Sequence, residues 1–289
     1  MSGPTDPATR DVGLFSGNVR IAAEGDPRAP ACLLVHGAPG TVRDFRYLAP
    51  AIAAQGLYAV RVGMPGFGET PRRTWPRVDA AGRAGFLAQV ASALGLVRYA
   101  VVGHSIGGPA ALLSAALFPN QVSALVLINS VGLLRHRGLS APEDLSRLLG
   151  LALKSPWLAP RVVPRLQQAY RRLGFRDVEA LDVAALSLHL DLIAGLDFQL
   201  HRWAARTVRC PVLVASSEDD PLVGPRVSFH LAGAFSPPAI VRHLHFAGGG
   251  HYLQKHEAPR LARHLAEMLA AEEMPALVVA PRAPASISG

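Results

Sequence analysis

Ser105 stands in a segment whose residue types suit nucleophilic chemistry. It lies within Gly103-His104-Ser105-Ile106-Gly107, after the apolar run Tyr99-Ala100-Val101-Val102 and before a helix-like stretch, 109–117. Small residues two positions either side of a serine let the backbone turn tightly between a strand and a helix and expose the hydroxyl. A serine hydroxyl is a weak nucleophile until a base, usually a histidine held by a carboxylate, removes its proton.

The acid and the base stand in two later loops. The apolar run 211–215 leads into Glu218-Asp219-Asp220-Pro221, and the run that ends near Phe246 leads into Ala247-Gly248-Gly249-Gly250-His251. We predict that His251 is the base of Ser105 and that a carboxylate of the earlier loop, Asp220 or Asp219, orients it. Asp219, next to Asp220, stays open as an alternative acid.

Other residues suit these roles less well. His243 and His245 lie two apart on one face of an expected strand, which favours structural roles, and we expect His256 to open the last helix. Asn129 follows the strand that ends at Ile128, but it offers no carboxylate. We therefore reject position 129 for the acid.

The elements that must position these residues follow from alternating apolar runs and helical patterns. Such an alternation predicts an α/β fold with a mostly parallel sheet covered by helices on both faces. Loops at the carboxyl ends of parallel strands meet at one edge, which would bring the serine, acid and base together. The expected strands span 17–23, 31–35, 57–62, 99–102, 124–128, 211–215 and 240–246. The expected helices include 80–94, 109–117, 226–232 and 258–271.

The alternation stops after Ser130 and resumes at Pro211, and the interval has helical spacing. We predict that residues 134–205 form a helical cap inserted between the two halves of the core. The core halves would be 17–133 and 206–273, with an N-terminal segment at 1–16 and a flexible tail at 274–289.

The predicted cap has a basic and leucine-rich part at 145–176, which contains no Asp or Glu. We favour an apolar side that covers the pocket, with the basic residues in water. A basic amphipathic face that rests on anionic lipid, or receives a fatty acyl chain, is the alternative. The apolar side chains are Leu148, Leu149, Leu151, Leu153, Trp157 and Leu158.

Together these motifs resemble the α/β-hydrolase fold family, in its capped serine hydrolase or esterase form, over about residues 17–271. The resemblance is carried by His36-Gly37-Ala38-Pro39-Gly40, Gly63-Met64-Pro65-Gly66-Phe67-Gly68, the turn at 103–107, Glu218-Asp219-Asp220-Pro221 and Gly250-His251. It implies a Ser105–Asp220–His251 catalytic triad, with Ser105 on the nucleophile elbow.

The same resemblance assigns further roles. The backbone N–H groups of Ala38 and Ile106 would form the oxyanion hole. The residues His36, Gly37, His104 and Gly107 would support the site, with both histidines orienting loops rather than transferring protons. Related dehalogenases and epoxide hydrolases carry Asp as the nucleophile, so Ser105 argues against both activities.

Composition excludes several classes of partner. The net charge of +8 is arginine-rich but spread along the chain, without aromatic interleaving or a nucleic-acid motif, so we expect no nucleic-acid partner. No 18-residue apolar window and no signal-peptide centre occur, which predicts no stable membrane insertion and a cytoplasmic location. The two cysteines are expected as buried small hydrophobes, and no Cys/His spacing resembles a zinc site.

The predicted function is a serine hydrolase that needs no cofactor and no metal. It would cleave a carboxylic ester, lactone or thioester of a small to medium apolar substrate through an acyl-enzyme. Alternatives stay open: a hydrolase of carbon–carbon bonds in a diketone-like acid, an enzyme of amide or peptide hydrolysis or of acyl transfer, and a non-catalytic ligand-binding protein of the same fold. A homodimer also stays open.

Overall fold

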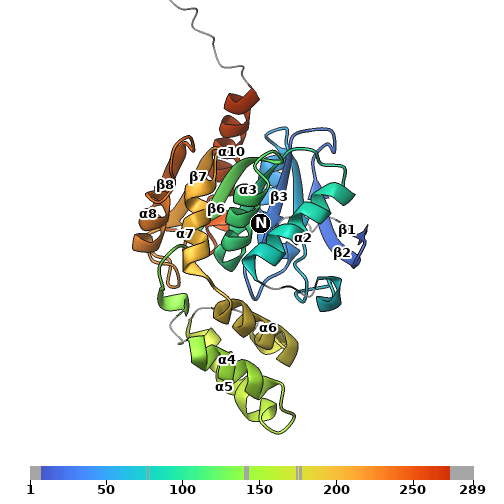
Figure 1. Ribbon diagram of the computed structural model, residues 1–289, viewed down its shortest axis with the longest axis vertical. Helices are drawn as coiled ribbons and strands as arrows, with labels where there is room; N and C mark the ends of the chain where they lie inside the picture. The colour runs from blue at the N-terminus through green and yellow to red at the C-terminus, as the bar shows by residue number, and fades with distance from the viewer. Residues whose placement is uncertain are drawn as a thin grey trace, which may run out of the picture.

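The computed structural model describes residues 8–75, 77, 79–139, 143–173, 175 and 178–273. In this part of the chain, eight strands form one sheet in the order β1-β2-β4-β3-β5-β6-β7-β8 (Figure 1). The pairs from β4 to β8 are parallel, and β1 and β2 are antiparallel to their neighbours. The mostly parallel α/β sheet is therefore confirmed. The strands are β1 Thr9–Leu14, β2 Gly17–Glu24, β3 Ala31–Val35, β4 Tyr58–Val62, β5 Tyr99–His104, β6 Val122–Ile128, β7 Val212–Ser217 and β8 Val241–Phe246.

The N-terminal segment differs from the expectation, because Thr9–Leu14 is the edge strand of the sheet. It pairs with β2 as a hairpin, from Thr9 opposite Ala22 to Leu14 opposite Gly17. Only Val12 is buried in this strand. An edge strand that buries a single side chain lacks the apolar alternation by which strands are detected.

Helices cover both faces of the sheet (Figure 1). One face packs against α2, α3 and α7 through a core that includes Val101, Leu113 and Ala205. The other packs against α1 and α10 through a core that includes Val102, Ile52 and Leu265. The helices of the main body are α1 Leu48–Ala53, α2 Ala80–Ala93, α3 Gly108–Leu117, α7 Phe198–Thr207, α8 Pro225–Ala232, α9 Leu253–His256 and α10 Ala258–Glu273. Short 3-10 helices span Val42–Phe45, Arg72–Thr74, Ser105–Gly107, Arg137–Leu139 and Val178–Ala180.

Three helices between β6 and β7 form a separate group at one end of the molecule (Figure 1). They are α4 Glu143–Leu153, α5 Ala159–Arg172 and α6 Val183–Ala194, and they share a small core of their own. Leu188 and Leu192 of α6 also join the main core. Helix α7, most of which the predicted cap includes, packs instead against α3.

The apolar side chains of α4 and of the turn after it do not all face inward. Leu153 is buried in the small core, whereas Leu148, Leu151, Trp157 and Leu158 are exposed. The expectation that the apolar side of this segment covers a pocket is therefore wrong for these four residues. Leucines occupy both sides of α4, so composition alone did not reveal which side faces α6.

In the described residues, no single helix is long and apolar enough to cross a membrane. Helices α6 and α7 have the required length and composition only as a pair, and they are bent by 69° relative to each other. Cys32 and Cys210 are both buried, as expected. The tail at 274–289 lies outside the described residues.

Candidate active site

Ser105 occupies a turn between β5 and α3 in which its backbone is left-handed, with φ of 53°. This conformation is uncommon for a residue with a side chain and persists only where surrounding structure enforces it. The backbone N–H of Val131 donates to the carbonyl oxygen of Ser105 at 3.0 Å. The turn therefore has the strand–turn–helix form that the sequence pattern indicated, and it is tied to the segment after β6.

A chain of hydrogen bonds connects Ser105 to a buried carboxylate. His251 Nε2 lies 3.0 Å from Ser105 Oγ, and His251 Nδ1 lies 2.9 Å from Asp220 Oδ2 and 3.1 Å from Oδ1. Because Nδ1–H must donate to the carboxylate, Nε2 of the neutral ring accepts from the serine hydroxyl. The structure thus brings the predicted serine, base and acid into one line.

The carboxylate of Asp220 is held in place by more than His251. Its Oδ1 accepts the backbone N–H groups of Leu222 at 2.8 Å and Val223 at 3.0 Å. Burial raises the pKa of Asp220, but the hydrogen bond and charge of His251, together with these N–H groups, outweigh burial and leave the pKa below its usual value. Asp220 is therefore ionised at neutral pH and oriented toward the imidazole.

Asp219 lies in the same loop but binds a different group. Its carboxylate accepts the backbone N–H of Gly250 at 2.8 Å and that of Gly249 at 3.3 Å. These bonds hold the glycine-rich loop that carries His251. The two adjacent acids therefore divide their tasks, and Asp220 is the one that contacts the imidazole.

Asn129 is a site residue that sequence reasoning missed. Its Nδ2 donates to the carbonyl oxygens of Gly250 at 2.7 Å and His251 at 3.1 Å, and its Oδ1 accepts the Ser217 N–H at 3.2 Å. The Ser217 hydroxyl donates to the same Gly250 oxygen at 2.8 Å. The available signal was position, since Asn129 follows β6 at the edge where the other site loops meet.

The loop 36–40 passes directly against the serine. A Cβ placed on Gly37 would lie 3.0 Å from Ser105 Cβ. His36 ties this loop to the next one, because Nδ1–H donates to the Gly37 carbonyl at 2.6 Å and Nε2 accepts the Met64 N–H at 3.1 Å. Ala38 follows Gly37, Ile106 follows Ser105, and both residues are buried. Their role as oxyanion donors stays a prediction.

The two histidines that flank the site are neutral supports in this geometry. His104 Nε2–H donates to the backbone oxygen of His251 at 2.9 Å. Burial, together with the charge of His251, lowers the pKa of His104 to about 3. Burial, together with the charge of Arg83, lowers the pKa of His36 to about 4. Both rings therefore act as fixed hydrogen-bonding groups.

The remaining histidine candidates have partners or positions other than those of His251. His243 Nε2 and His245 Nδ1 both contact Ser216 Oγ, at 2.9 and 3.0 Å, from one face of β8. His256 ends α9 rather than opening α10. In the described residues, no group of three or more His, Cys, Asp or Glu side chains is placed to hold a metal ion.

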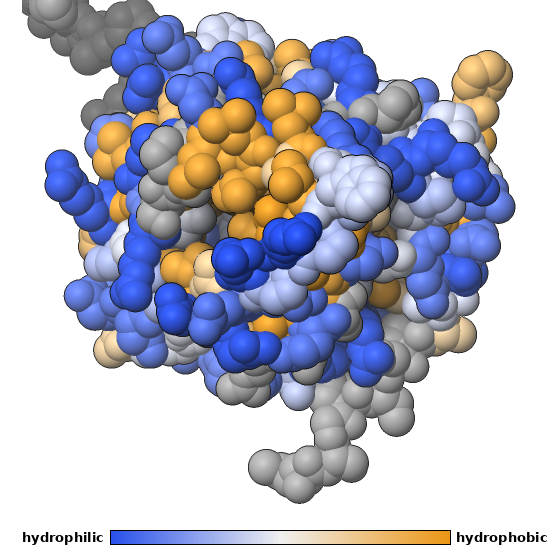
Figure 2. Space-filling view, turned by 90° about the horizontal axis from the view of Figure 1, so that it is seen from below, coloured by the Kyte–Doolittle hydropathy of each residue, from blue (hydrophilic) through white to orange (hydrophobic). Residues whose placement is uncertain are grey.

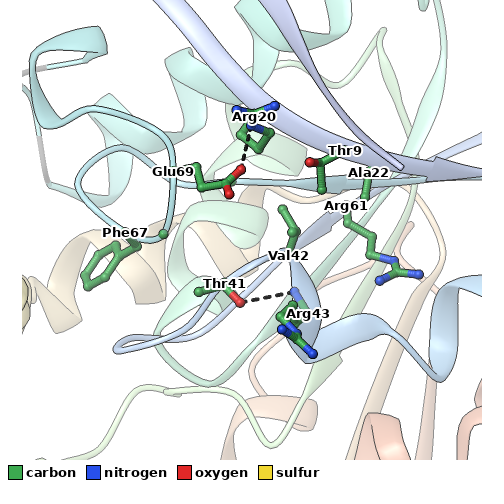
Figure 3. A pocket seen from close by; sticks show the side chains of 11 residues that line it. Thr9, Arg20, Ala22, Thr41, Val42, Arg43, Arg61, Phe67 and Glu69 are labelled. Atoms are coloured by element: carbon green, nitrogen blue, oxygen red, sulfur yellow. Dashed lines mark hydrogen bonds and ion pairs between the residues drawn. The ribbon is translucent and has the colours of Figure 1, made fainter. Parts of the chain in front are cut away.

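A cavity of about 260 Å³ lies between β2, β4 and the loops after β3 and β4, and its lining includes neither Ser105 nor Asp220 nor His251 (Figure 3). Arginines line it, but acidic residues accompany them. Arg20 pairs with Glu69 at 2.7 Å and with Asp11 at 3.3 Å, and Arg61 pairs with Glu24. The cavity is therefore not a strongly positive site.

The strand order of the sheet and the position of Ser105, on the tight turn between β5 and α3, are those of an α/β protein with a nucleophile elbow. Comparison with protein families agrees, since residues 30–169 match the model described as alpha/beta hydrolase fold. A relative named "Putative carbamate hydrolase RutD" from Enterobacter cloacae is 31% identical over 217 residues, which cover 71% of this chain and 79% of that protein. The chain belongs to the alpha/beta hydrolase fold family.

Solved structures share the fold at lower identity. An alpha/beta hydrolase fold protein from Nakamurella multipartita superposes with a TM-score of 0.62 at 24% identity, covering 91% of this chain and 99% of that one. The enol-lactonase from Burkholderia xenovorans LB400 gives a TM-score of 0.70 at 17% identity, covering 90% and 100%. At these identities the likeness concerns the fold alone.

Proposed function

We propose that this protein is a serine hydrolase that cleaves a carboxylic ester or lactone through an acyl-enzyme. The observation that carries the proposal is the hydrogen-bond chain Ser105–His251–Asp220. Ser105 Oγ attacks the carbonyl carbon while His251 Nε2 takes its proton. His251 then gives that proton to the leaving oxygen. A water molecule, deprotonated by the same nitrogen, releases the acyl group from Ser105.

The other groups stabilise the charges that form during these steps. Asp220 holds the imidazole in the reactive tautomer and stabilises the imidazolium. The N–H groups of Ala38 and Ile106 are proposed to hold the oxyanion of the tetrahedral intermediate. One such donor contributes about 3 kcal/mol to transition-state stabilisation.

The substrate class is supported by the name of the relative that is 31% identical, a putative carbamate hydrolase. Carbamates, esters and lactones all present a carbonyl carbon that a serine can attack, with an oxyanion forming at the carbonyl oxygen. An ester or lactone substrate for this chain fits the same sequence of steps.

The test is hydrolysis of a p-nitrophenyl ester series, from acetate to octanoate, by wild type, Ser105→Ala and Ser114→Ala. Ser114 is a matched control, because its hydroxyl donates to the Ala110 carbonyl within its own helix, α3. We expect Ser105→Ala to lose about 10⁴-fold or more in kcat, with Ser114→Ala close to wild type. Full activity of Ser105→Ala would overturn the mechanism.

A probe independent of ester preference separates a wrong substrate from an inactive site. A fluorophosphonate labels a serine that a neighbouring base activates. Labelling of wild type but not of Ser105→Ala supports the proposed nucleophile even where the esters tested are poor substrates. If wild type shows no labelling and hydrolyses none of the esters, the result supports the alternative of a non-catalytic ligand-binding protein.

A further inference from the structure

Arg83 is a buried cation next to the candidate active site. It lies in the first turn of α2, and its side chain reaches the serine turn, where Nη1 donates to the Ile106 carbonyl at 3.0 Å. The residue is only 6% exposed. It also lies near His36 of the loop 36–40 and His189 of α6, since its charge lowers the pKa of both histidines. Arg83 therefore stands between the serine turn and the group of helices α4–α6.

The charge of Arg83 has no counter-charge in the described part of the chain. Its Nη2 is buried and has no hydrogen-bond partner, and no described carboxylate forms an ion pair with the guanidinium. Burial lowers its pKa to about 10, so the group remains charged at neutral pH. His36 and His189, with pKa values lowered to about 4 and about 3, are neutral neighbours.

Arg83 lines a small hollow whose other walls are mostly apolar. They are formed by Pro65, Phe67, Trp75, Leu188 and Leu192, together with Arg77, which pairs with Asp79 at 3.5 Å. The hollow measures about 10 Å³, room for about one water molecule. Leu188 and Leu192 belong to α6, so an outward shift of this helix is what would enlarge it.

An unpaired buried charge is strongly unfavourable, and such groups cluster at functional sites where a ligand supplies the partner. A guanidinium matches the geometry of a carboxylate, to which it can donate two parallel hydrogen bonds. We propose that the substrate carries a carboxylate on its acyl side and that Arg83 binds it. This inference rests on the proposed function, and it narrows that function to esters or lactones of dicarboxylic acids.

The first test uses wild type and two esters that differ only at the end of the acyl arm. Mono-p-nitrophenyl adipate ends in a carboxylate, and p-nitrophenyl 6-methylheptanoate has an isopropyl group of similar shape in its place. We expect kcat/KM to favour the adipate ester by about 10- to 100-fold after subtraction of the rate without enzyme. Turnover of both at equal kcat/KM overturns the inference and leaves the proposed function intact, whereas turnover of neither counts against the function.

Variants then assign the preference to Arg83. Arg83→Met should abolish the preference, so that kcat/KM becomes equal for the two esters, and Arg83→Lys should retain part of the preference. A purely structural role for Arg83 would lower both rates by the same factor. Product inhibition of wild type needs no variant: adipate should inhibit more strongly than 6-methylheptanoate, and equal inhibition constants contradict the inference.

A different observation concerns the outer face of α4 and the turn that follows it. Figure 2 looks onto this end of the molecule and shows hydrophobic residues gathered there. Leu148 and Leu151 are each 62% exposed, and Trp157 is 80% exposed. We call this set, with Leu145 and Leu158, the apolar patch; both added residues are also exposed. Contiguous exposed apolar side chains of this kind mark interaction surfaces.

The charges around the apolar patch select one kind of partner. Helix α4 begins with Glu143 and Asp144, but the stretch from Leu145 to Leu173 contains no acidic residue. Its basic residues are Arg147, Lys154, Arg161, Arg165, Arg171 and Arg172, of which Arg171 pairs with Glu179. Exposed leucine and tryptophan beside long basic side chains match the surface of an anionic bilayer. A second copy of the same surface would bring like charges together in a two-fold contact. We infer that the apolar patch docks this protein peripherally on anionic lipid.

The test is co-sedimentation of the full chain with vesicles of phosphatidylcholine alone, or with 30% phosphatidylglycerol, at low and high salt. We expect binding to the anionic vesicles at low salt and its loss in the double variant Leu148→Glu/Leu151→Glu. Phe15→Glu is the matched control, because Phe15 is fully exposed at the β1–β2 turn, outside α4 and α5.

Two results would overturn the docking inference. One is wild type that stays in the supernatant with every vesicle. The other is a dimer in sedimentation velocity that the double variant dissociates, which would assign the apolar patch to a second copy of the chain.

Discussion

The serine turn and the helices α4–α6 differ in where their polar and apolar side chains lie. Around Ser105, the loops after four strands, β5, β6, β7 and β8, hold the polar side chains of the candidate site by short hydrogen bonds among largely buried atoms. In α4 and its following turn, large apolar side chains and basic residues face outward. In the first region each of these hydrogen bonds requires a particular side chain at a particular position. The second region is held together by its small core, so the residues on its outer face are available for the docking contact proposed above.

The largest expected effect separates the two adjacent acids of the β7 loop. Asp220→Asn should lower kcat by about 10⁴-fold, because an amide at this position favours the wrong tautomer of His251. Asp219→Asn should cost less than about tenfold, since its neutral oxygen still accepts the N–H groups of Gly249 and Gly250. Steady-state kinetics on the best p-nitrophenyl ester measures both. Equal losses would mean that loop geometry, rather than the contact with the imidazole, sets activity.

The next effect concerns the backbone of the serine turn. A Cβ added at Gly107 would lie 2.4 Å from the Val35 oxygen and 2.5 Å from the His36 oxygen. Because both contacts are with backbone, no side chain can move aside. Gly107→Ala should therefore reduce the free energy of unfolding by about 3 kcal/mol, near the upper range for overpacked cores. Urea unfolding measures this, and a variant as stable as wild type would show that β3 and the turn are less rigidly packed than described.

The same contrast explains how much of the molecule was predictable from sequence. The sheet was predictable because parallel strands buried on both faces are continuous apolar runs, such as 31–35 and 124–128. Ser105 and His251 were predictable because their neighbouring glycines and strand ends are local signals. The choice between Asp219 and Asp220 was not settled locally, since adjacent residues differ only in the direction that the folded loop gives their side chains.

Residues whose roles depend on distant partners left no local signal. Asn129 acts on carbonyl groups more than a hundred positions away in the chain, at Gly250 and His251. Arg83 looks like any arginine near a helix start, and only the folded chain reveals its burial. The outward leucines of α4 were misread for the converse reason: apolar residues suggest burial, although a helix with leucines on both sides can bury only one of them.

Acid should weaken both regions together. Burial, with the charge of His251, lowers the pKa of His104 in the serine turn to about 3, and burial, with the charge of Arg83, does the same for His189 in α6. An unfolded histidine has a pKa of about 6.5. Between these values the unfolded chain binds more protons, so stability is fully present above pH ~6.5 and falls as the pH drops toward ~3.

Urea unfolding between pH 7 and pH 4.5 measures this loss. His189→Gln should show a shallower decline than wild type, by about one proton in the linkage slope, because the unfolded variant no longer takes up that proton. His264→Gln is the control, since this residue lies on the outer side of α10 beside Glu267. An unchanged slope in His189→Gln would show that the ring is already protonated in the folded protein.

The smallest expected effect is that of a glycine-to-alanine substitution in α4, which can be compared with Gly107→Ala in the serine turn. Gly150 lies inside α4, and a Cβ there would meet nothing closer than Asp191 Oδ1 at 3.5 Å. Alanine is favoured over glycine inside a helix by about 0.5–1 kcal/mol, so Gly150→Ala should raise stability by that amount. Urea unfolding checks the sign, and ester kinetics should stay at the wild-type value. A loss of stability here, comparable to that of Gly107→Ala, would mean that α4 is packed against α6 as tightly as the serine turn is packed against β3.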